Sequence, residues 1–345
     1  MREFIPFSEI GEKTCIVVDA LHPEALVLSH WKGGNKHPKI AADTSGEIVL
    51  NALQSNFHGL ESEFVSANHF DIDGFVGVFS LVYPELAKKY DAMLREMAII
   101  GDFREYKPQN KNSQQALQLC CWMNKVESEK FYRPFGEKDE MKLCVKKFDY
   151  FLAKFPEVLQ EPEKFKADWE EEVGRIEADL ELLQSKGKRE FLQGLKLMVQ
   201  EVPQPIHYYV AFSDSYGFDM VMNLYDENRF ELECKYTTWV DIASRPTLPR
   251  VNLQPLAKQL NKIEENDYQW EVDKITDTGP ILRLESKELS KADRFDQPYR
   301  RAIYSSTIPK EVFKKTVLDF LSLAYQNIEP KRFWTWDEMR AFNKS

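Results

Sequence analysis

The feature that most constrains the fold is a series of short apolar runs in the first third of the chain. Residues 14–20, 25–30 and 63–68 each contain such a run, without the alternation of apolar and polar positions that marks a half-exposed strand. Uninterrupted runs of this length are typical of strands that are buried on both faces of a parallel sheet. We therefore expect three parallel strands at these positions.

Helical patterns follow the expected strands, as they do in an α/β unit. A capping-box sequence predicts a helix over residues 45–55. The spacing of apolar residues predicts two more, over 75–82 and 85–100, the second of which ends at Gly101. Residues 1–110 are thus expected to form an α/β domain with a mainly parallel sheet.

Beyond residue 110 the pattern changes twice. Charged residues at helical spacing extend over 111–201 and predict a helical middle segment. After Pro203 and Pro205 the apolar period becomes two, which predicts an α+β domain over 202–345. The expected elements of this domain are strands over 207–212, 218–225, 229–236 and 280–285 and helices over 254–264 and 310–325.

Composition limits the classes of function. A net charge of −10 argues against a protein that binds duplex DNA, because such proteins are usually basic. Five cysteines without a CxxC pair give no reason to expect a disulfide scaffold or a zinc knuckle. The sequence shows neither a signal peptide nor an apolar stretch near the ~20 residues that span a membrane. We therefore expect a cytoplasmic protein that contacts neither duplex DNA nor membrane.

Polar side chains gather at the ends of the expected strands. Asp19 and His30 end the first two strands, and the third runs directly into segment 69–74. Because the carboxyl ends of parallel strands share one edge, where ligands commonly bind, we expect these side chains to meet. Imidazole and carboxylate oxygen together suit Mn²⁺ or Mg²⁺ better than an ion that prefers thiolate. The predicted metal ligands are Asp19, His69, Asp71 and Asp73.

A plainer interpretation of the same segment stays open. Asp71 or Asp73 would then cap the helix that follows, which aspartate does well, and His69 would be a hydrogen-bonded loop residue. Three polar groups that are costly to bury at one strand end favour a shared function over three separate structural roles.

Part of this region resembles a known superfamily. Residues 65–78 resemble the first motif of DHH-type phosphoesterases, in which a strand leads into His/Asp-x-Asp-x-Asp-Gly and then a helix. Residues 28–31 and 43–49 are similar to the stretch around the triplet that gives the superfamily its name. Ser29 and Trp31 stand where that triplet has Asp and His, and the two motifs occur in reverse order, as in a permuted and degenerate relative.

The resemblance implies a phosphoesterase that uses two Mn²⁺ or Mg²⁺ ions. Asp19 is then similar to the aspartate that ends the strand before the triplet. His30 and Asp102 complete the candidate site as catalytic residues, and His30 would either bind metal, contact phosphate or protonate the leaving group. The expected substrate is a small phosphorylated molecule or a short nucleotide.

Two arginines of the last domain are candidates for binding the substrate's phosphate. Arg245 and Arg250 flank a proline-containing loop, and the guanidinium group matches phosphate oxygens in geometry and charge. The alternative is that both are surface residues paired with neighbouring carboxylates.

Over most of its length the chain resembles an uncharacterised bacterial family of unknown function. This resemblance is carried by residues 28–31, 43–47, 68–74, 101–103 and 245–251. It implies no activity. The sequence therefore favours a metal-dependent, phosphoesterase-like hydrolase. The alternative, favoured by Ser29 and Trp31, is a non-catalytic binding or scaffold protein that retains a degenerate phosphoesterase-like fold; a homo-oligomer is compatible with both.

Overall fold

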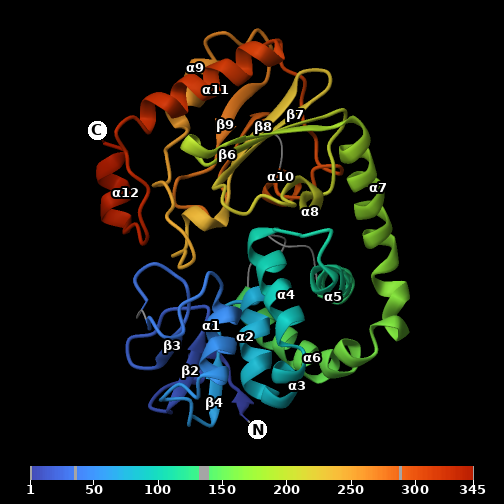
Figure 1. Cartoon of the computed structure of the whole chain (residues 1–345), viewed down its shortest axis with the longest axis vertical. Helices are drawn as coiled ribbons and strands as arrows, with labels where there is room; N and C mark the ends of the chain where they lie inside the picture. The colour runs from blue at the N-terminus through green and yellow to red at the C-terminus, as the bar shows by residue number, and fades with distance from the viewer. Residues whose placement is uncertain (1, 35–36, 132–139, 287–289, 345) are drawn as a thin grey trace. The chain divides into compact units, whose positions relative to one another are not determined.

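The chain divides into two units. The computed structural model describes residues 2–34, 37–131, 140–286 and 290–344 (Figure 1). The first unit comprises Met1–Gly174 and Ile242–Ser244, and the second comprises Arg175–Asp241 and Arg245–Ser345. The division falls within helix α7 (Glu170–Lys186). No helix of the described residues is long and apolar enough to cross a membrane.

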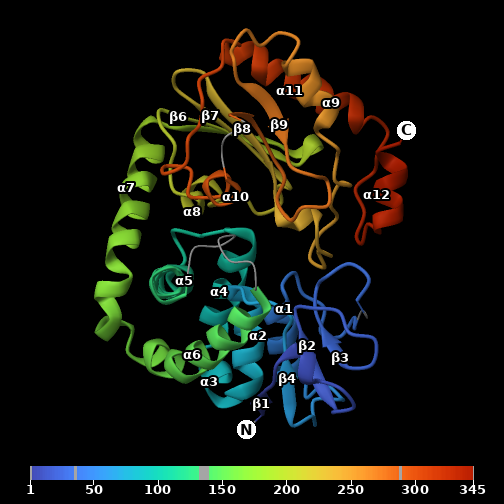
Figure 2. The ribbon, with the colours of Figure 1, turned by 180° about the vertical axis from the view of Figure 1, so that it is seen from behind.

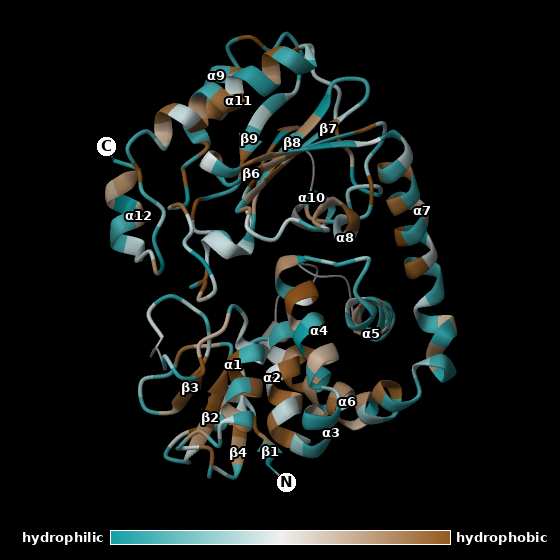
Figure 3. Cartoon of the chain, viewed as in Figure 1, coloured by the Kyte–Doolittle hydropathy of each residue, from teal (hydrophilic) through white to brown (hydrophobic). Residues whose placement is uncertain are grey.

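Among the described residues, the first unit contains one sheet of four strands. These are β1 (Glu3–Phe4), β2 (Cys15–Val18), β3 (Leu26–Leu28) and β4 (Phe64–Ser66). They lie in the order β1-β4-β2-β3, and every pairing between them is parallel. Every residue of β2 is buried, and this strand appears brown, as hydrophobic, in Figure 3. The expected parallel sheet is confirmed, and its carboxyl edge carries the loops that follow β2, β3 and β4.

Of the helices in this unit, α1 (Ser45–Gln54) and α2 (Ile72–Val82) pack against the sheet. The unit also contains α3 (Pro84–Lys89), α4 (Asp91–Phe103), α5 (Lys111–Lys130) and α6 (Glu140–Gln160), with 3-10 helices at Phe7–Glu9 and Pro162–Asp168. Helices α1, α2 and α4 pack against one another. The prediction of a single helix over 85–100 is wrong. The helix is interrupted at Tyr90, and α4 runs from Asp91 through Gly101 to Phe103.

The second unit is built on a mixed sheet, which within residues 175–286 has six strands. These are β5 (Lys188–Leu192), β6 (Leu197–Val202), β7 (Met220–Tyr225), β8 (Arg229–Cys234), β9 (Gln269–Val272) and β10 (Ile281–Glu285), in the order β5-β6-β7-β8-β10-β9. The pair β6 and β7 is parallel and the other pairs are antiparallel. Helices α9 (Gln254–Leu260) and α11 (Lys310–Ala324) lie side by side in both views and pack into the core of this sheet (Figures 1 and 2). The expected α+β architecture is confirmed.

Two local expectations for this unit are wrong. The sequence predicts that residues 188–201 continue the helical segment, but residues 188–202 form the hairpin of β5 and β6. Their backbone groups bond across strands, and β6 also pairs with β7. Residues 207–212 were expected to form a strand but contain the short helix α8 (Tyr208–Ala211). The His207 imidazole accepts a hydrogen bond from the Tyr209 amide and caps this helix. Two further short helices are α10 (Lys291–Arg294) and α12 (Trp336–Phe342).

Candidate metal centre

The carboxyl edge of the first sheet collects the polar side chains that the sequence singles out. Asp19 follows β2 directly, and His30 lies two residues beyond β3. The loop after β4 supplies the side chains that precede and begin α2, and the last turn of α4 supplies one more. The residues brought together are Asp19, His30, His69, Asp71, Asp73 and Asp102.

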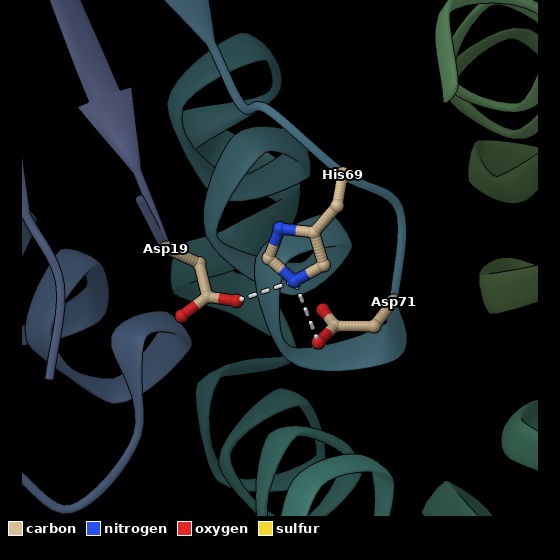
Figure 4. A group of neighbouring side chains, drawn as sticks. All are labelled: Asp19, His69 and Asp71. Carbon is tan, nitrogen blue, oxygen red and sulfur yellow. Dashed lines mark hydrogen bonds and ion pairs between the residues drawn. The ribbon is translucent and has the colours of Figure 1, made fainter. Parts of the chain in front are cut away.

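One half of the cluster, which we call the outer group, consists of Asp19, His69 and Asp71. The His69 Nε2 atom lies 3.2 Å from Asp19 Oδ2 and 3.2 Å from Asp71 Oδ2 (Figure 4). Figure 4 shows the imidazole between the two carboxylates rather than turned into the core. The side chains of His69 and Asp71 are 35% and 39% exposed, so solvent reaches this group.

The other half, the inner group, consists of Asp19, His30 and Asp73. The His30 Nε2 atom lies 3.3 Å from Asp19 Oδ1 and 3.7 Å from Asp73 Oδ2. Asp102 approaches from α4 and places its Oδ2 atom 3.8 Å from the same nitrogen. The His30 side chain is 1% exposed, so the inner group is closed to solvent. Each group offers three ligand atoms within 4.8 Å of one another, a spacing that a single cation can span.

Asp19 belongs to both groups. Its Oδ2 atom faces His69 and its Oδ1 atom faces His30, so one carboxylate joins the two halves. Asp19 has a φ of 48°, in the left-handed region that non-glycine residues rarely occupy. Such a backbone persists only where the surrounding structure holds it, and here the Ser45 hydroxyl donates to Asp19 Oδ1 at 2.6 Å.

Both histidines are oriented through the ring nitrogen that faces away from the cluster. His30 Nδ1 lies 2.5 Å from the carbonyl oxygen of Asp43, and His69 Nδ1 lies 2.8 Å from Oδ1 of Asn68. Each Nδ1–H can donate to these oxygens, which directs Nε2 toward the carboxylates. Metal-binding histidines are typically fixed in this way by a carbonyl or carboxylate partner.

The two aspartates of segment 69–74 are anchored by backbone amides. Asp73 accepts hydrogen bonds from the Ser45 and Gly46 amides, both at 2.8 Å, at the start of α1. Asp71 caps α2 by accepting from the Gly74 amide at 2.7 Å through Oδ1, while its Oδ2 atom faces His69. The capping role expected in the plainer interpretation is therefore present, and it leaves one oxygen of Asp71 for the outer group.

The carboxylates raise the pKa of both histidines. Burial alone would lower the pKa of His30, but the charges of Asp102, Asp73 and Asp19 hold it well above its ordinary value. Burial acts in the same direction on His69, and Asp71 and Asp19 again raise its pKa. In return, the hydrogen bonds from both histidines outweigh burial at Asp19 and hold the pKa of that carboxyl below its usual range.

The pKa values of Asp73 and Asp102 shift in the opposite direction from that of Asp19. Burial, together with the charge of Asp19, raises the pKa of Asp73 well above its ordinary value. Burial is also the largest influence on Asp102 and raises its pKa to about 7. The Asp102 Oδ2 atom is buried without a hydrogen-bond partner. Four carboxyl groups crowded around two imidazoles thus favour proton binding at Asp73 and Asp102, and a divalent cation could take the place of these protons.

The two arginines predicted to bind phosphate belong to the second unit. Arg250 is buried and donates to Thr238 Oγ1 at 2.7 Å and to the Thr278 carbonyl at 2.6 Å, so its guanidinium group holds a loop of that unit. Arg245 donates to Asp219 at 2.6 Å. These contacts give Arg250 a structural role and do not by themselves support phosphate binding by either residue.

The comparisons with known proteins identify the family. The sequence profile of DUF6687, a family of unknown function, matches residues 1–332. The chain belongs to DUF6687. Neither a curated protein nor a solved structure matches it. The expected membership of a family of unknown function is confirmed, whereas the comparisons give no support to a relationship between DUF6687 and DHH-type phosphoesterases.

Several backbone and side-chain groups that contact the cluster of this DUF6687 member could not be predicted from the sequence. The backbone amides of Ser45 and Gly46, the carbonyl of Asp43 and the side chain of Asn68 all contact the cluster. The capping-box sequence located the start of α1 correctly, with Thr44 as the N-cap. Nothing in the sequence indicated that this helix start would face Asp73.

Proposed function

We propose that the chain is a metal-dependent, phosphoesterase-like hydrolase that acts on a small phosphorylated or nucleotide substrate. The observation that carries this proposal is the position of Asp19 between two groups, each completed by one histidine and one further aspartate. A carboxylate whose two oxygens face different ligand sets is suited to bridging two cations. Two-metal hydrolytic sites place their ions about 3.5–4 Å apart.

The residues present fit two divalent cations. The outer group would hold one, and the inner group would hold the other with Asp102 as a fourth ligand, since its Oδ2 atom is buried, unpartnered and 3.8 Å from His30 Nε2. Imidazole nitrogen with carboxylate oxygen favours Mn²⁺ and is compatible with Mg²⁺. When bound, such ions neutralise charge on a phosphoryl group and lower the pKa of water.

The geometry also divides the roles of the two histidines. His30 is closed to solvent and surrounded by Asp19, Asp73 and Asp102, so we assign it to cation binding rather than to proton transfer with the substrate. His69 lies on the exposed side and, with Asp71, defines the face that a substrate would approach. These assignments differ from the expectation drawn from the sequence, in which His30 and Asp102 are catalytic residues. Their positions beside Asp19 and Asp73 favour both as ligands of the inner cation.

The structure also favours one alternative, a binding or scaffold protein. Both oxygens of Asp73 are engaged by the start of α1, and Asp71 caps α2, so these residues stabilise the fold even without metal. In that alternative the centre would bind a cation for stability and catalyse nothing.

Calorimetric titration of the metal-stripped full chain with Mn²⁺ tests the proposal. We expect two Mn²⁺ ions per chain for the wild type and loss of both in Asp19→Asn, which removes the shared charge while keeping the shape of the side chain. The matched control is Asp149→Asn, the same change at an exposed position of α6, which should bind as the wild type does.

Hydrolysis of bis(p-nitrophenyl) phosphate with Mn²⁺ then separates the two functions. Activity that Asp19→Asn loses supports the hydrolase. A folded wild type, verified by circular dichroism, that binds no Mn²⁺ would refute the metal centre. Binding of Mn²⁺ without hydrolysis of this ester, of p-nitrophenyl phosphate or of pyrophosphate would favour the scaffold.

A further inference from the structure

The centre is open on one side only. The inner group is closed, with His30 1% exposed and Asp73 fully buried, whereas His69 and Asp71 of the outer group are partly exposed. A substrate must therefore approach along the outer group. The side chains that border His69 then determine which organic group attached to the phosphate fits beside the centre.

Trp31 borders His69 on this side. Trp31 is a partly exposed residue, and its ring centroid lies 5.5 Å from that of His69, with the two ring planes 39° apart. Trp31 follows β3 at the same edge of the sheet, and a turn fixes its backbone. Its amide donates to Ser29 Oγ at 3.2 Å, and its carbonyl accepts from the Gly34 amide at 3.2 Å.

A second apolar side chain lies beside the same turn. Leu21 is 41% exposed, which is unusual for leucine in this chain, where most leucines are buried. A Cβ atom built on Gly34 would meet both the Trp31 carbonyl oxygen at 3.3 Å and Leu21 Cδ2 at 3.4 Å, so leucine and turn are in close proximity. Exposed apolar surface next to a charged centre marks a place where the non-polar part of a ligand can be buried.

We propose that the substrate's organic part is a flat aromatic ring that stacks on Trp31 while its phosphoryl group occupies the outer group. This inference rests on the proposed function and narrows it to phosphoesters that carry an aromatic group. Two sources share this chemistry, the base of a nucleotide and the ring of an aryl phosphate. Stacking on a tryptophan changes affinity by roughly 5- to 150-fold when the tryptophan is removed.

Calorimetric binding to the Mn²⁺-loaded full chain tests the inference. The phosphonates used cannot be hydrolysed, and an assay for released inorganic phosphate shows whether the phosphate esters are turned over during the titration. Phenylphosphonate and methylphosphonate present the same phosphoryl group with and without a ring, and AMP and ribose 5-phosphate do so with and without a base. We expect the wild type to bind the ring-bearing member of at least one pair at least fivefold more tightly. Trp31→Ala should remove this preference and leave methylphosphonate affinity unchanged, and Trp31→Phe, which keeps a flat ring, should retain part of it.

The outcomes separate this inference from the proposed function. A gain for AMP over ribose 5-phosphate supports a nucleotide as the source, and a gain for phenylphosphonate alone supports an aryl phosphate. Mn²⁺-dependent methylphosphonate binding with no preference for either ring, or a preference that Trp31→Ala leaves intact, would overturn the stacking role alone. Failure of all four compounds to bind the Mn²⁺-loaded protein would overturn the proposed function and this inference with it.

Discussion

Asp102 provides the sharpest test of whether the cluster is built for a cation, because it should destabilise the metal-free protein. Its Oδ2 atom is buried without a hydrogen-bond partner, and burial raises the pKa of this carboxyl from 3.8 to about 7. Asn has nearly the same shape and no charge. Asp102→Asn should therefore stabilise the metal-free fold and weaken cation binding at the same time.

The magnitude follows from the difference between the folded and unfolded pKa. Below pH 3.8 the carboxyl is protonated in both states and contributes nothing. As the pH rises to about 7, the unfolded chain ionises while the folded chain resists, so stability is lost throughout this window. At about 1.4 kcal/mol per pH unit, the full loss is about 4 kcal/mol at pH 8 and less than about 2 kcal/mol at pH 5.

Thermal unfolding by circular dichroism measures the effect. A unit of this size shifts its Tm by roughly 2–4 °C per kcal/mol, so Asp102→Asn in EDTA should unfold about 10 °C above the wild type at pH 8, with a clearly smaller gain at pH 5. Saturating Mn²⁺ should reverse the order, because the wild type gains more from the ion. Asp149→Asn, at an exposed helical position, should change neither value. A variant less stable than the wild type at pH 8 in EDTA would mean that Asp102 has a structural role.

Two further predictions concern the same unit. Mn²⁺ affinity should increase from pH 6 to pH 8, because carboxylates hold the pKa of His30 and His69 above the ordinary value and a cation must displace their protons. Calorimetry in buffers of different ionisation enthalpy counts the protons released on binding. A count of zero would contradict this reasoning. Gly77→Ala should destabilise the unit by about 1–3 kcal/mol, because the new Cβ atom would lie 2.5 Å from Val18 Cγ1 where α2 crosses β2. Thermal unfolding measures the change in Tm. An unchanged Tm would show that α2 and β2 can move apart.

The strands of the first unit could be predicted because burial on both faces leaves a mark in the sequence. Continuous apolar runs gave the positions of β2, β3 and β4, and parallel strands bring their carboxyl ends together. The convergence of Asp19, His30 and His69 followed from that topology alone. The hairpin at 188–202 could not be found in the same way, because its charged residues fit an exposed helix as well as an edge strand.

Gly101 shows why Asp102 was harder to place. A glycine near the end of an apolar helix pattern usually marks the helix end, and we expected one there. In the structure Gly101 lies inside α4, and a Cβ atom at this position would lie 2.5 Å from Ile72 Cβ, so the contact with Ile72 requires glycine. This close approach of α4 to the start of α2 sets Asp102 beside the inner group. Sequence alone does not distinguish a glycine that ends a helix from one that lets two helices touch.

The backbone amides that donate to Asp73 could not be predicted from the sequence, for a different reason. Backbone N–H groups at a helix start are the same whichever residues carry them, so the sequence of α1 does not reveal that Ser45 and Gly46 would face Asp73. Their role depends on how α1 and α2 pack, which is a property of the folded unit and not of either segment.

The position of Asp19 between two histidines has a consequence for how this family diversifies. Because each of its oxygens serves a different half of the cluster, the proposed two-cation site would lose both halves through a change at this one position. Members of the family should therefore fall into two classes, those that keep Asp19 with both histidines and those that have lost all three. Chains that retain one histidine after losing Asp19 should be rare, and comparing the members' sequences would expose them.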